Sequence, residues 1–195
     1  LKRALEIVRR EQPDAIVSVD TYRPLVARRC VEEFGADIIN DVSEGGITGI
    51  VGKEIHEEGD MFETVAQLGV PYILMSVQPT LEKMMQNFAA GVQRLRDLGA
   101  KDIILDPGYG FGKTLEQNYE IMSEAERLLA LELPVLVGVS RKSMIFRKFG
   151  ITPEESLPAT QVLHYKALCL GADILRVHDV AEAVRTVALY RELEH

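Results

Sequence analysis

The sequence predicts an α/β fold whose parallel strands are arranged as a barrel, on three observations. Short runs of aliphatic and β-branched residues alternate with longer stretches of helical periodicity. The runs are almost continuously apolar, as strands are when helices bury both of their faces. A polar residue follows each run, and a barrel gathers the C-terminal ends of all its strands around one opening, whereas an open sheet concentrates its ligand residues at one switch point.

Six strands are expected, each ending in a polar side chain. The apolar runs span residues 15–19, 37–39, 72–75, 103–105, 135–139 and 174–177. The polar residues at their ends are Asp20, Asn40, Ser76, Asp106, Ser140 and the pair of Arg176 and His178. In a barrel these strand ends surround a single site.

Helices are expected before the first strand, between the strands and after the last one. They span residues 1–10, 24–34, 61–68, 80–98, 114–131, 158–170 and 180–193. A TIM (β/α)8 barrel has eight βα units in about 250 residues. The chain is therefore expected to hold about six of these units in one domain over residues 1–192, with the other two upstream of Leu1. Residues 193–195 resemble the remnant of an expression tag and are left out of the functional interpretation.

Composition excludes several classes of function. The 195 residues are 47% hydrophobic and 27% charged, as in one soluble domain, and no apolar run approaches the roughly 18 residues of a membrane span. The net charge of −8 argues against a nucleic-acid or acidic membrane surface, so an anion site needs a local basic cluster. Cys30 and Cys169 lie on apolar faces of separate helices and predict buried thiols in a reducing compartment.

The glycine-rich string at residues 106–114 differs from two phosphate-binding loops that it resembles. A P-loop needs glycine where Pro107 stands, and a dinucleotide fingerprint needs two residues between its last glycines, where only Phe111 lies. The alternating glycines instead let the chain turn tightly and place Asp106 at the barrel opening. A plain turn with a capping aspartate is the alternative.

Asp20, Asn40 and Asp106 together offer two carboxylates and one amide. A carboxylate accepts from adjacent N–H and NH₂ groups of a flat heterocycle, and an amide supplies a donor and an acceptor, a pattern that suits a pterin or guanine edge. Two carboxylates also occur in glycosidases and metal sites, but the amide and the nearby basic groups weaken those alternatives. Thr21 and Asp41 are expected to be capping residues.

A basic cluster is expected at the last two strand ends. Residues 140–143 read Ser-Arg-Lys-Ser, and Arg176 and His178 end the sixth strand. Residues two apart in a strand face the same side, so Arg176 and His178 can hold one anion together. The final strands of such barrels are a common phosphate site. His56 and His164 are expected to have no chemical role, and the glycine-rich connection at 42–60 reads as a mobile loop, either a lid or a plain insertion.

Taken together, these strings resemble dihydropteroate synthase, a family of pterin-binding barrels in the folate pathway. The resemblance covers essentially the whole chain, and its discriminating strings lie at 140–143 and 176–180. It implies a transferase that condenses (7,8-dihydropterin-6-yl)methyl diphosphate with 4-aminobenzoate to give dihydropteroate and diphosphate. A non-catalytic pterin-binding fragment and a pterin-dependent methyltransferase domain are the alternatives.

The resemblance also implies which residues bind the pterin ring. Asp20, Asn40 and Asp106 would contact the ring, and Met75 and Gly138 would shape its slot. Ser76 stands where the family usually has histidine, so it is assigned no role.

Three basic residues are implied to be catalytic: Lys142, Arg176 and His178. Arg176 and His178 would hold the diphosphate, and Lys142 would reach the pterin and line the entrance for 4-aminobenzoate, near Ser143 and Phe111. Such a substitution needs stabilisation of the leaving group more than a strong base, because the amine is already a nucleophile.

The remaining expectations concern cofactor, partners and location. The resemblance implies Mg²⁺ with its family ligand upstream of Leu1, so no metal ligand is named in this chain. It also implies small-molecule substrates, a homodimer through the late helices, a cytoplasmic location, and no nucleic-acid or membrane partner. Catalysis by this chain alone is expected to be impaired, since two open strand edges remain.

Overall fold

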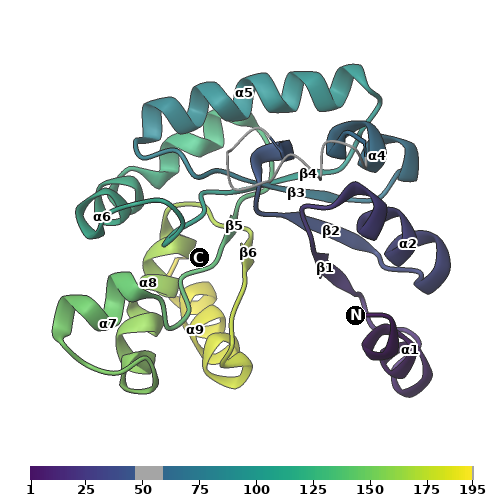
Figure 1. Cartoon of the computed structure of the whole chain (residues 1–195). Coiled ribbons are helices and arrows are strands. Elements are labelled where there is room, and N and C mark those ends of the chain that lie inside the picture. The colour runs from purple at the N-terminus through teal and green to yellow at the C-terminus, as the bar shows by residue number, and fades with distance from the viewer. Residues whose placement is uncertain (47–58, 195) are drawn as a thin grey trace. The chain divides into compact units, whose positions relative to one another are not determined.

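The computed structural model describes residues 1–46 and 59–194 (Figure 1). The chain forms two compact units: unit 1 comprises Leu1–Met75 and Phe88–Ile104, and unit 2 comprises Ser76–Asn87 and Leu105–His195. Both contain strands and helices in alternation. Most of the connection expected to be a mobile loop at 42–60, and with it His56, lies outside the described residues. No described helix is both long and apolar enough to cross a membrane.

The strands of unit 1 lie in chain order. They are β1 (Ser18–Asp20), β2 (Ile38–Asp41), β3 (Tyr72–Met75) and the first half of β4 (Ile103–Asp106). β1 pairs with β2 and β2 with β3 in parallel, with Asp20 opposite Asn40 and Asn40 opposite Ile73. Because side chains alternate along a strand, Asp20 and Asn40 lie on one face, and so does Met75, two residues after Ile73.

The helices of unit 1 begin and end where local signals place them. They are α1 (Lys2–Glu11), α2 (Pro24–Phe34), α4 (Met61–Leu68) and, shared with unit 2, α5 (Leu81–Asp97). α4 starts at Asp60, whose carboxylate accepts from the Glu63 amide at 3.0 Å, and ends at Gly69 with a left-handed φ of 65°. These are strong helix boundaries, and the sequence predicted both α2 and α4 with their observed bounds.

Asp41 organises the turn that follows β2. Its buried carboxylate accepts hydrogen bonds from the Ser43 amide at 2.8 Å, the Ser43 hydroxyl at 2.6 Å, the Gly45 amide at 3.0 Å and the Tyr72 hydroxyl at 2.6 Å. Burial raises the pKa of Asp41, and these donors oppose that rise. A Cβ on Gly45 would lie 2.3 Å from the Phe62 ring, so only glycine fits there. The turn carries the chain into η1 (Glu44–Gly46).

Unit 2 contains the second half of β4, together with β5 (Leu136–Val137) and β6 (Ile174–Leu175). Leu105 forms a parallel bridge with Val135, and β5 pairs with β6 in parallel. Its helical segments are α6 (Leu115–Ser123), η2 (Ala125–Leu131), α7 (Ser143–Phe149), η3 (Glu154–Ser156), α8 (Leu157–Cys169) and α9 (Val180–Leu193). The described strands do not pair into a closed barrel.

The structure corrects four sequence expectations. The helix expected at 114–131 is two segments, α6 and the 3-10 helix η2, separated at Glu124. The run at 15–19 forms a strand only over 18–20, because Ile16 is 78% exposed and pairing starts at Ser18. The seven-residue helix α7 was not predicted; its N-cap residue Lys142 makes no side-chain capping bond. Cys169 is exposed at the end of α8, whereas Cys30 is buried as expected, and both thiols are free.

We expect Tyr72→Phe to destabilise unit 1. Removing the hydroxyl leaves a buried carboxylate with one donor fewer, which costs about 1–3 kcal/mol. The pKa of Asp41 is raised in the folded state, so folding disfavours its ionised form above that pKa. The stability lost in Tyr72→Phe should shrink as pH falls, because a protonated Asp41 no longer needs the hydroxyl as a donor. Urea unfolding at pH 7 and pH 4 measures both effects.

The matched control is Tyr119→Phe, which removes a hydroxyl that donates to the Met144 carbonyl at 2.7 Å. Its cost should be about 0.5–1.5 kcal/mol and change less with pH, because a carbonyl does not titrate. Equal costs at both pH values for Tyr72→Phe would show that Asp41 does not depend on this donor.

Candidate functional site

Asp106 ends β4 as a fully buried carboxylate in unit 2. Its Oδ1 accepts from the Gly108 amide at 2.8 Å, and Nη2 of Arg176 lies 3.0 Å from its Oδ2. That second contact has the distance of an ion pair but not the angles of a hydrogen bond, so Oδ2 has no hydrogen-bond partner among the described residues. A buried carboxylate oxygen in this state can accept from a bound ligand.

The loop after β4 is held in shape by Lys113 and three glycines. Gly108, Gly110 and Gly112 have φ values of 63°, 83° and 63°, which other residues adopt only with strain. The Lys113 ammonium donates to the carbonyls of Ser76, Gly108 and Phe111 at 2.8, 3.1 and 3.2 Å. The sequence predicted no role for Lys113. These three acceptors are backbone carbonyls, so the structure rather than the sequence identifies Lys113 as the residue that fixes this loop.

Arg176 follows β6 and lies against Gly138, which follows β5. A Cβ at Gly138 would stand 2.7 Å from Nη2 and 3.0 Å from Nε of Arg176. The guanidinium of Arg176 therefore lies in the space that a side chain at position 138 would fill. Nη1 of Arg176 is buried and has no hydrogen-bond partner among the described residues, which leaves a cationic donor available to a ligand.

Lys142 extends from the end of the loop after β5 into the same group of residues. Its ammonium donates to the Tyr109 carbonyl and lies 4.4 Å from the centre of the Phe111 ring. Burial lowers the pKa of Lys142 to about 8; the nearby Asp106 charge opposes that shift and the Arg176 charge adds to it. Burial and the Asp106 charge raise the pKa of the Tyr109 hydroxyl, which stays neutral.

A small polar pocket joins these basic residues. It has a volume of about 110 Å³ and is lined by Gly138, Ser140, Lys142, Arg176, Val177 and His178. At roughly 30 Å³ per water molecule, this is room for a small anion rather than for a whole heterocycle. His178 is exposed, and its amide donates to the Ser140 hydroxyl at 3.2 Å, so the loops that follow β5 and β6 are joined beside the pocket.

Ser143 begins α7, directly after Lys142, and is partly exposed. Phe111 is also partly exposed. The structure thus brings seven of the residues expected from the sequence into one region of unit 2. Six are joined by the contacts and the pocket just described, and Ser143 by its position next to Lys142 in the chain. They are Asp106, Phe111, Gly138, Lys142, Ser143, Arg176 and His178.

Unit 1 contains the other three expected residues on one face of its sheet. Asp20 is exposed, whereas Asn40 is 4% exposed and Met75 is fully buried. Oδ1 of Asn40 is buried without a hydrogen-bond partner among the described residues. An amide oxygen in that condition calls for a ligand or a water.

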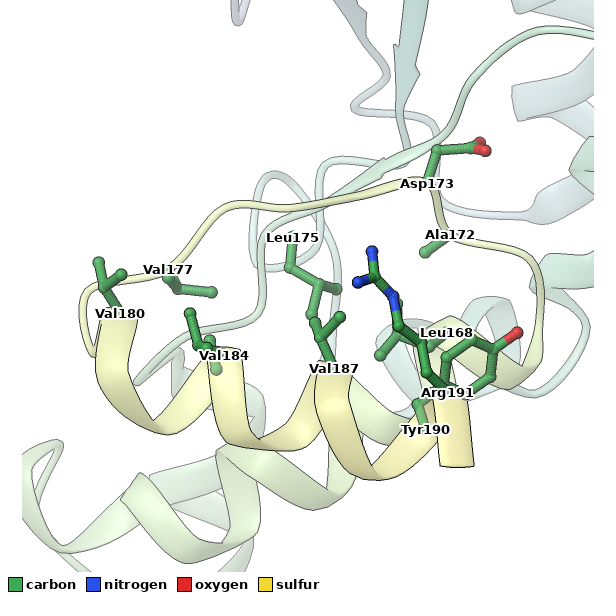
Figure 2. A pocket seen from close by; sticks show the side chains of 11 residues that line it. Leu168, Ala172, Asp173, Leu175, Val177, Val180, Val184, Val187, Tyr190 and Arg191 are labelled. Carbon is green, nitrogen blue, oxygen red and sulfur yellow. The ribbon is translucent and has the colours of Figure 1, made fainter. Parts of the chain in front are cut away.

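A larger hollow in unit 2 is apolar and lacks this chemistry. Figure 2 shows Val184 and Val187 of α9 pointing toward Leu175 and Val177 of the β6 segment, around a groove of about 380 Å³. Its charged lining residues are Asp173, which accepts from the Val135 amide, and Arg191. Because no set of polar groups converges on this groove, we place the candidate site at the strand ends, not here.

The described part of the chain offers no ligand set for a resident metal ion. Among residues 1–46 and 59–194, no group of three or more His, Cys, Asp or Glu side chains could hold a metal ion. His164, expected to have no chemistry, is fully buried in α8, where burial lowers its pKa.

Comparisons with known proteins point to one family. A model of the pterin binding enzyme family matches residues 1–178. The chain is 34% identical to the dihydropteroate synthase of Clostridium beijerinckii and 34% identical to that of Escherichia coli. These matches cover 97% and 88% of this chain, and 70% and 62% of the two relatives.

Solved structures of the same family resemble this chain in fold. A dihydropteroate synthase from Yersinia pestis superposes with a TM-score of 0.86 at 29% identity, covering 98% of this chain and 77% of that one. One from Thermus thermophilus gives a TM-score of 0.86 at 30% identity, covering 100% and 78%. The likeness confirms the predicted α/β fold of the TIM-barrel type.

We expect Lys142→Met to stabilise unit 2 at neutral pH. The folded pKa of about 8 lies below the ordinary value of 10.5, so folding penalises the charged lysine. This penalty is complete below pH 8 and disappears as pH rises to 10.5. Allowing for partial exposure, the gain should be about 1–2 kcal/mol at pH 7 and smaller at pH 10.

Urea unfolding at both pH values tests this, with the exposed Lys166→Met as the control, for which a change within about 0.5 kcal/mol is expected. A gain for Lys142→Met that is the same at pH 7 and pH 10 would rule out burial of the charge as its cause.

Proposed function

We propose that this chain carries the pterin- and diphosphate-binding residues of a dihydropteroate synthase. The chain belongs to the pterin-binding enzyme family and, within that family, to the dihydropteroate synthases. The reaction is the condensation of (7,8-dihydropterin-6-yl)methyl diphosphate with 4-aminobenzoate. The chain spans 62–70% of the length of the two relatives compared above. The activity is accordingly proposed for the protein of which this chain is a part.

The observation that carries the proposal is the unsatisfied charge pair in unit 2. Asp106 and Arg176 each have a buried polar atom without a hydrogen-bond partner among the described residues, and Lys142 lies within electrostatic reach of both. Native proteins rarely leave buried polar atoms unpaired except where a ligand or water completes them. A ligand with N–H donors at one end and anionic oxygens at the other supplies what both atoms lack.

We assign the carboxylate to the pterin. Asp106 Oδ2 can accept from the ring N–H or the exocyclic amino group, as a carboxylate does when two donors are adjacent. On the family resemblance, Asp20, Asn40 and Met75 are also proposed as pterin-binding residues. Within unit 1, Oδ1 of Asn40 likewise has no hydrogen-bond partner among the described residues. Gly138 is proposed, on the family resemblance, to shape the pterin slot; in the structure the guanidinium of Arg176 lies where a Cβ at Gly138 would stand.

We assign the basic residues to the leaving group. The amine nitrogen of 4-aminobenzoate forms a bond to the methylene carbon, the carbon–oxygen bond to diphosphate breaks, and the nitrogen loses a proton. The departing diphosphate gains negative charge, which the cationic Arg176 and Lys142 and the donor groups of His178 can stabilise from fixed positions. Phe111 and Ser143, next to Lys142, are proposed to line the place of 4-aminobenzoate.

Magnesium remains a proposal that rests on the family resemblance. The residues described in the structure offer no ligand cluster for it, so no step of the reaction is derived through the metal. A cytoplasmic location is proposed on the same resemblance and on the two free thiols, Cys30 and Cys169, which suit a reducing compartment.

Asp106→Asn should weaken pterin binding. The substitution keeps the size of the side chain but replaces the acceptor of two N–H donors, and loss of a charge-assisted pair costs about 1.5–3 kcal/mol, or roughly ten- to a hundredfold in affinity. Calorimetric titration with (7,8-dihydropterin-6-yl)methyl diphosphate measures it.

The control is Asp102→Asn, an exposed carboxyl near the start of β4, which should bind as the parent chain does. If Asp106→Asn binds the pterin as tightly as the parent, Asp106 is not its ligand and the proposed site is wrong. Turnover with 4-aminobenzoate is measured separately, on both this chain and a full-length form.

We further propose that the outer face of α8 and α9 is a homodimer contact. A shallow apolar hollow of about 330 Å³ lies there, and three large side chains on it are strongly exposed: Val162 at 67%, Leu189 at 61% and Leu193 at 67%. A contiguous exposed apolar patch on a folded protein is typical of an interaction surface.

Leu189→Glu should convert the dimer to a monomer, because a charge placed in an apolar contact is left without a partner. Light scattering after size exclusion measures the mass, and the exposed Arg185→Glu on the same helix is the control. A monomeric parent chain would contradict the assignment of this face.

A further inference from the structure

We propose that the ion pair between Arg141 and Asp179 is a clamp that positions Lys142 and His178, a role that rests on the diphosphate site proposed above. Neither Arg141 nor Asp179 lines the polar pocket. Each acts through the residue next to it in the chain, so the two are positioning residues rather than catalytic ones.

The pair has the geometry of a fork. Nε of Arg141 lies 2.9 Å from Oδ2 of Asp179, and Nη2 of Arg141 lies 2.5 Å from Oδ1. Two parallel charge-assisted bonds fix direction as well as distance. The two side chains are 31% and 15% exposed, so the pair is less hydrated than an ordinary surface ion pair. The hydrogen bonds from Arg141, and then its charge, hold the pKa of Asp179 below its usual value.

The clamp joins the two loops whose backbone is no longer held by the sheet. β5 and β6 pair Leu136 with Ile174 and Val137 with Leu175, and the backbone ladder ends at the bond from the Arg176 amide to the Val137 carbonyl. Lys142 and His178 come several residues later, beyond this short ladder. Arg141 directly precedes Lys142 and Asp179 directly follows His178, so the bond between them sets the separation of the two functional residues.

Two weaker contacts support the same loops. The His178 amide donates to the Ser140 hydroxyl at 3.2 Å, and the Arg141 amide donates to the Thr160 hydroxyl of α8 at 3.3 Å. Neither involves a charged side chain. The Arg141–Asp179 pair is the charge-assisted bond that links the two loops through side chains at both ends.

The backbone of Arg141 is strained in a way that the clamp explains. Its φ is 51°, in the left-handed region that residues other than glycine seldom occupy. Such strain persists where surrounding contacts over-determine the conformation, and it is typical of functional sites. The conformation directs the guanidinium to Asp179 while the next residue, Lys142, extends to the Tyr109 carbonyl.

Asp179→Asn tests the clamp with little change of shape. Without the carboxylate, Lys142 should leave its buried position, and its titration, followed through the side-chain ¹³Cε resonance, should move from about 8 toward the ordinary 10.5. This readout needs no ligand. The Lys142→Arg spectrum assigns the resonance, and thermal unfolding confirms that the variant is folded.

A second readout is the affinity for inorganic pyrophosphate, measured by calorimetry. It should fall about ten- to a hundredfold in Asp179→Asn, as is typical when a residue that orients a ligand-binding group is removed. Arg141→Lys keeps the charge but loses the fork, and its affinity should lie between those of the parent and Asp179→Asn. Glu124→Gln removes the exposed Arg127–Glu124 pair and should change neither readout.

The outcomes separate the clamp from the proposed function. Unchanged Lys142 titration and unchanged pyrophosphate affinity in Asp179→Asn would overturn the clamp. Pyrophosphate that fails to bind the parent chain would instead refute the diphosphate site, and the Lys142 titration would still decide whether the clamp positions that residue. If Asp179→Asn does not fold, the same two readouts in Arg141→Lys decide the question.

Discussion

The ion pair between Asp106 and Arg176 is the interaction on which the rest of the unit 2 site depends. The guanidinium reaches the carboxylate only because Gly138 has no side chain to stand in its place. Both charges act on Lys142, whose pKa reflects its burial first and these two neighbours next. Moving either charge would alter the electrostatics of the whole pocket.

This ion pair leaves some of the hydrogen-bonding capacity of its two side chains unused. The ion-pair distance of 3.0 Å is short, yet neither Oδ2 of Asp106 nor Nη1 of Arg176 has a hydrogen-bond partner in the part of the chain that the structure describes. Burying charges without completing their hydrogen bonds costs stability. Other bonds offset that cost by fixing the loop after β4, in particular the three from the Lys113 ammonium to backbone carbonyls. A site held open in this way has little left to reorganise when a ligand arrives.

Local signals made much of the fold predictable. α2 and α4 have their predicted bounds because each ends at a glycine in the left-handed conformation, Gly35 or Gly69, and β3 has its predicted bounds because all four of its residues are buried. The polar residues at strand ends were predictable for the same reason, since parallel strands present their ends at one edge. Strand alternation also placed Asp20, Asn40 and Met75 on one face.

Tertiary contacts decided what the sequence could not predict. α7 has no capping side chain to announce it, and the exposure of Cys169 depends on what packs near the end of α8. Lys113 works through carbonyl groups, which have no signature in sequence. The partnership of Arg141 and Asp179 joins residues 38 positions apart. Arg141 was visible as part of a basic string, but its partner was visible only as the residue after a histidine.

The depressed pKa of Lys142 has a consequence for chemical reactivity. With a pKa of about 8, roughly a tenth of its side chains are uncharged amines at pH 7, against well under a thousandth for an ordinary lysine. Only the uncharged amine is a nucleophile, so acylating reagents and aldehydes that reach the pocket should modify this lysine ahead of the exposed ones. The polar pocket thereby carries its own selective labelling site, and an anion that fills it should protect the amine from reagent.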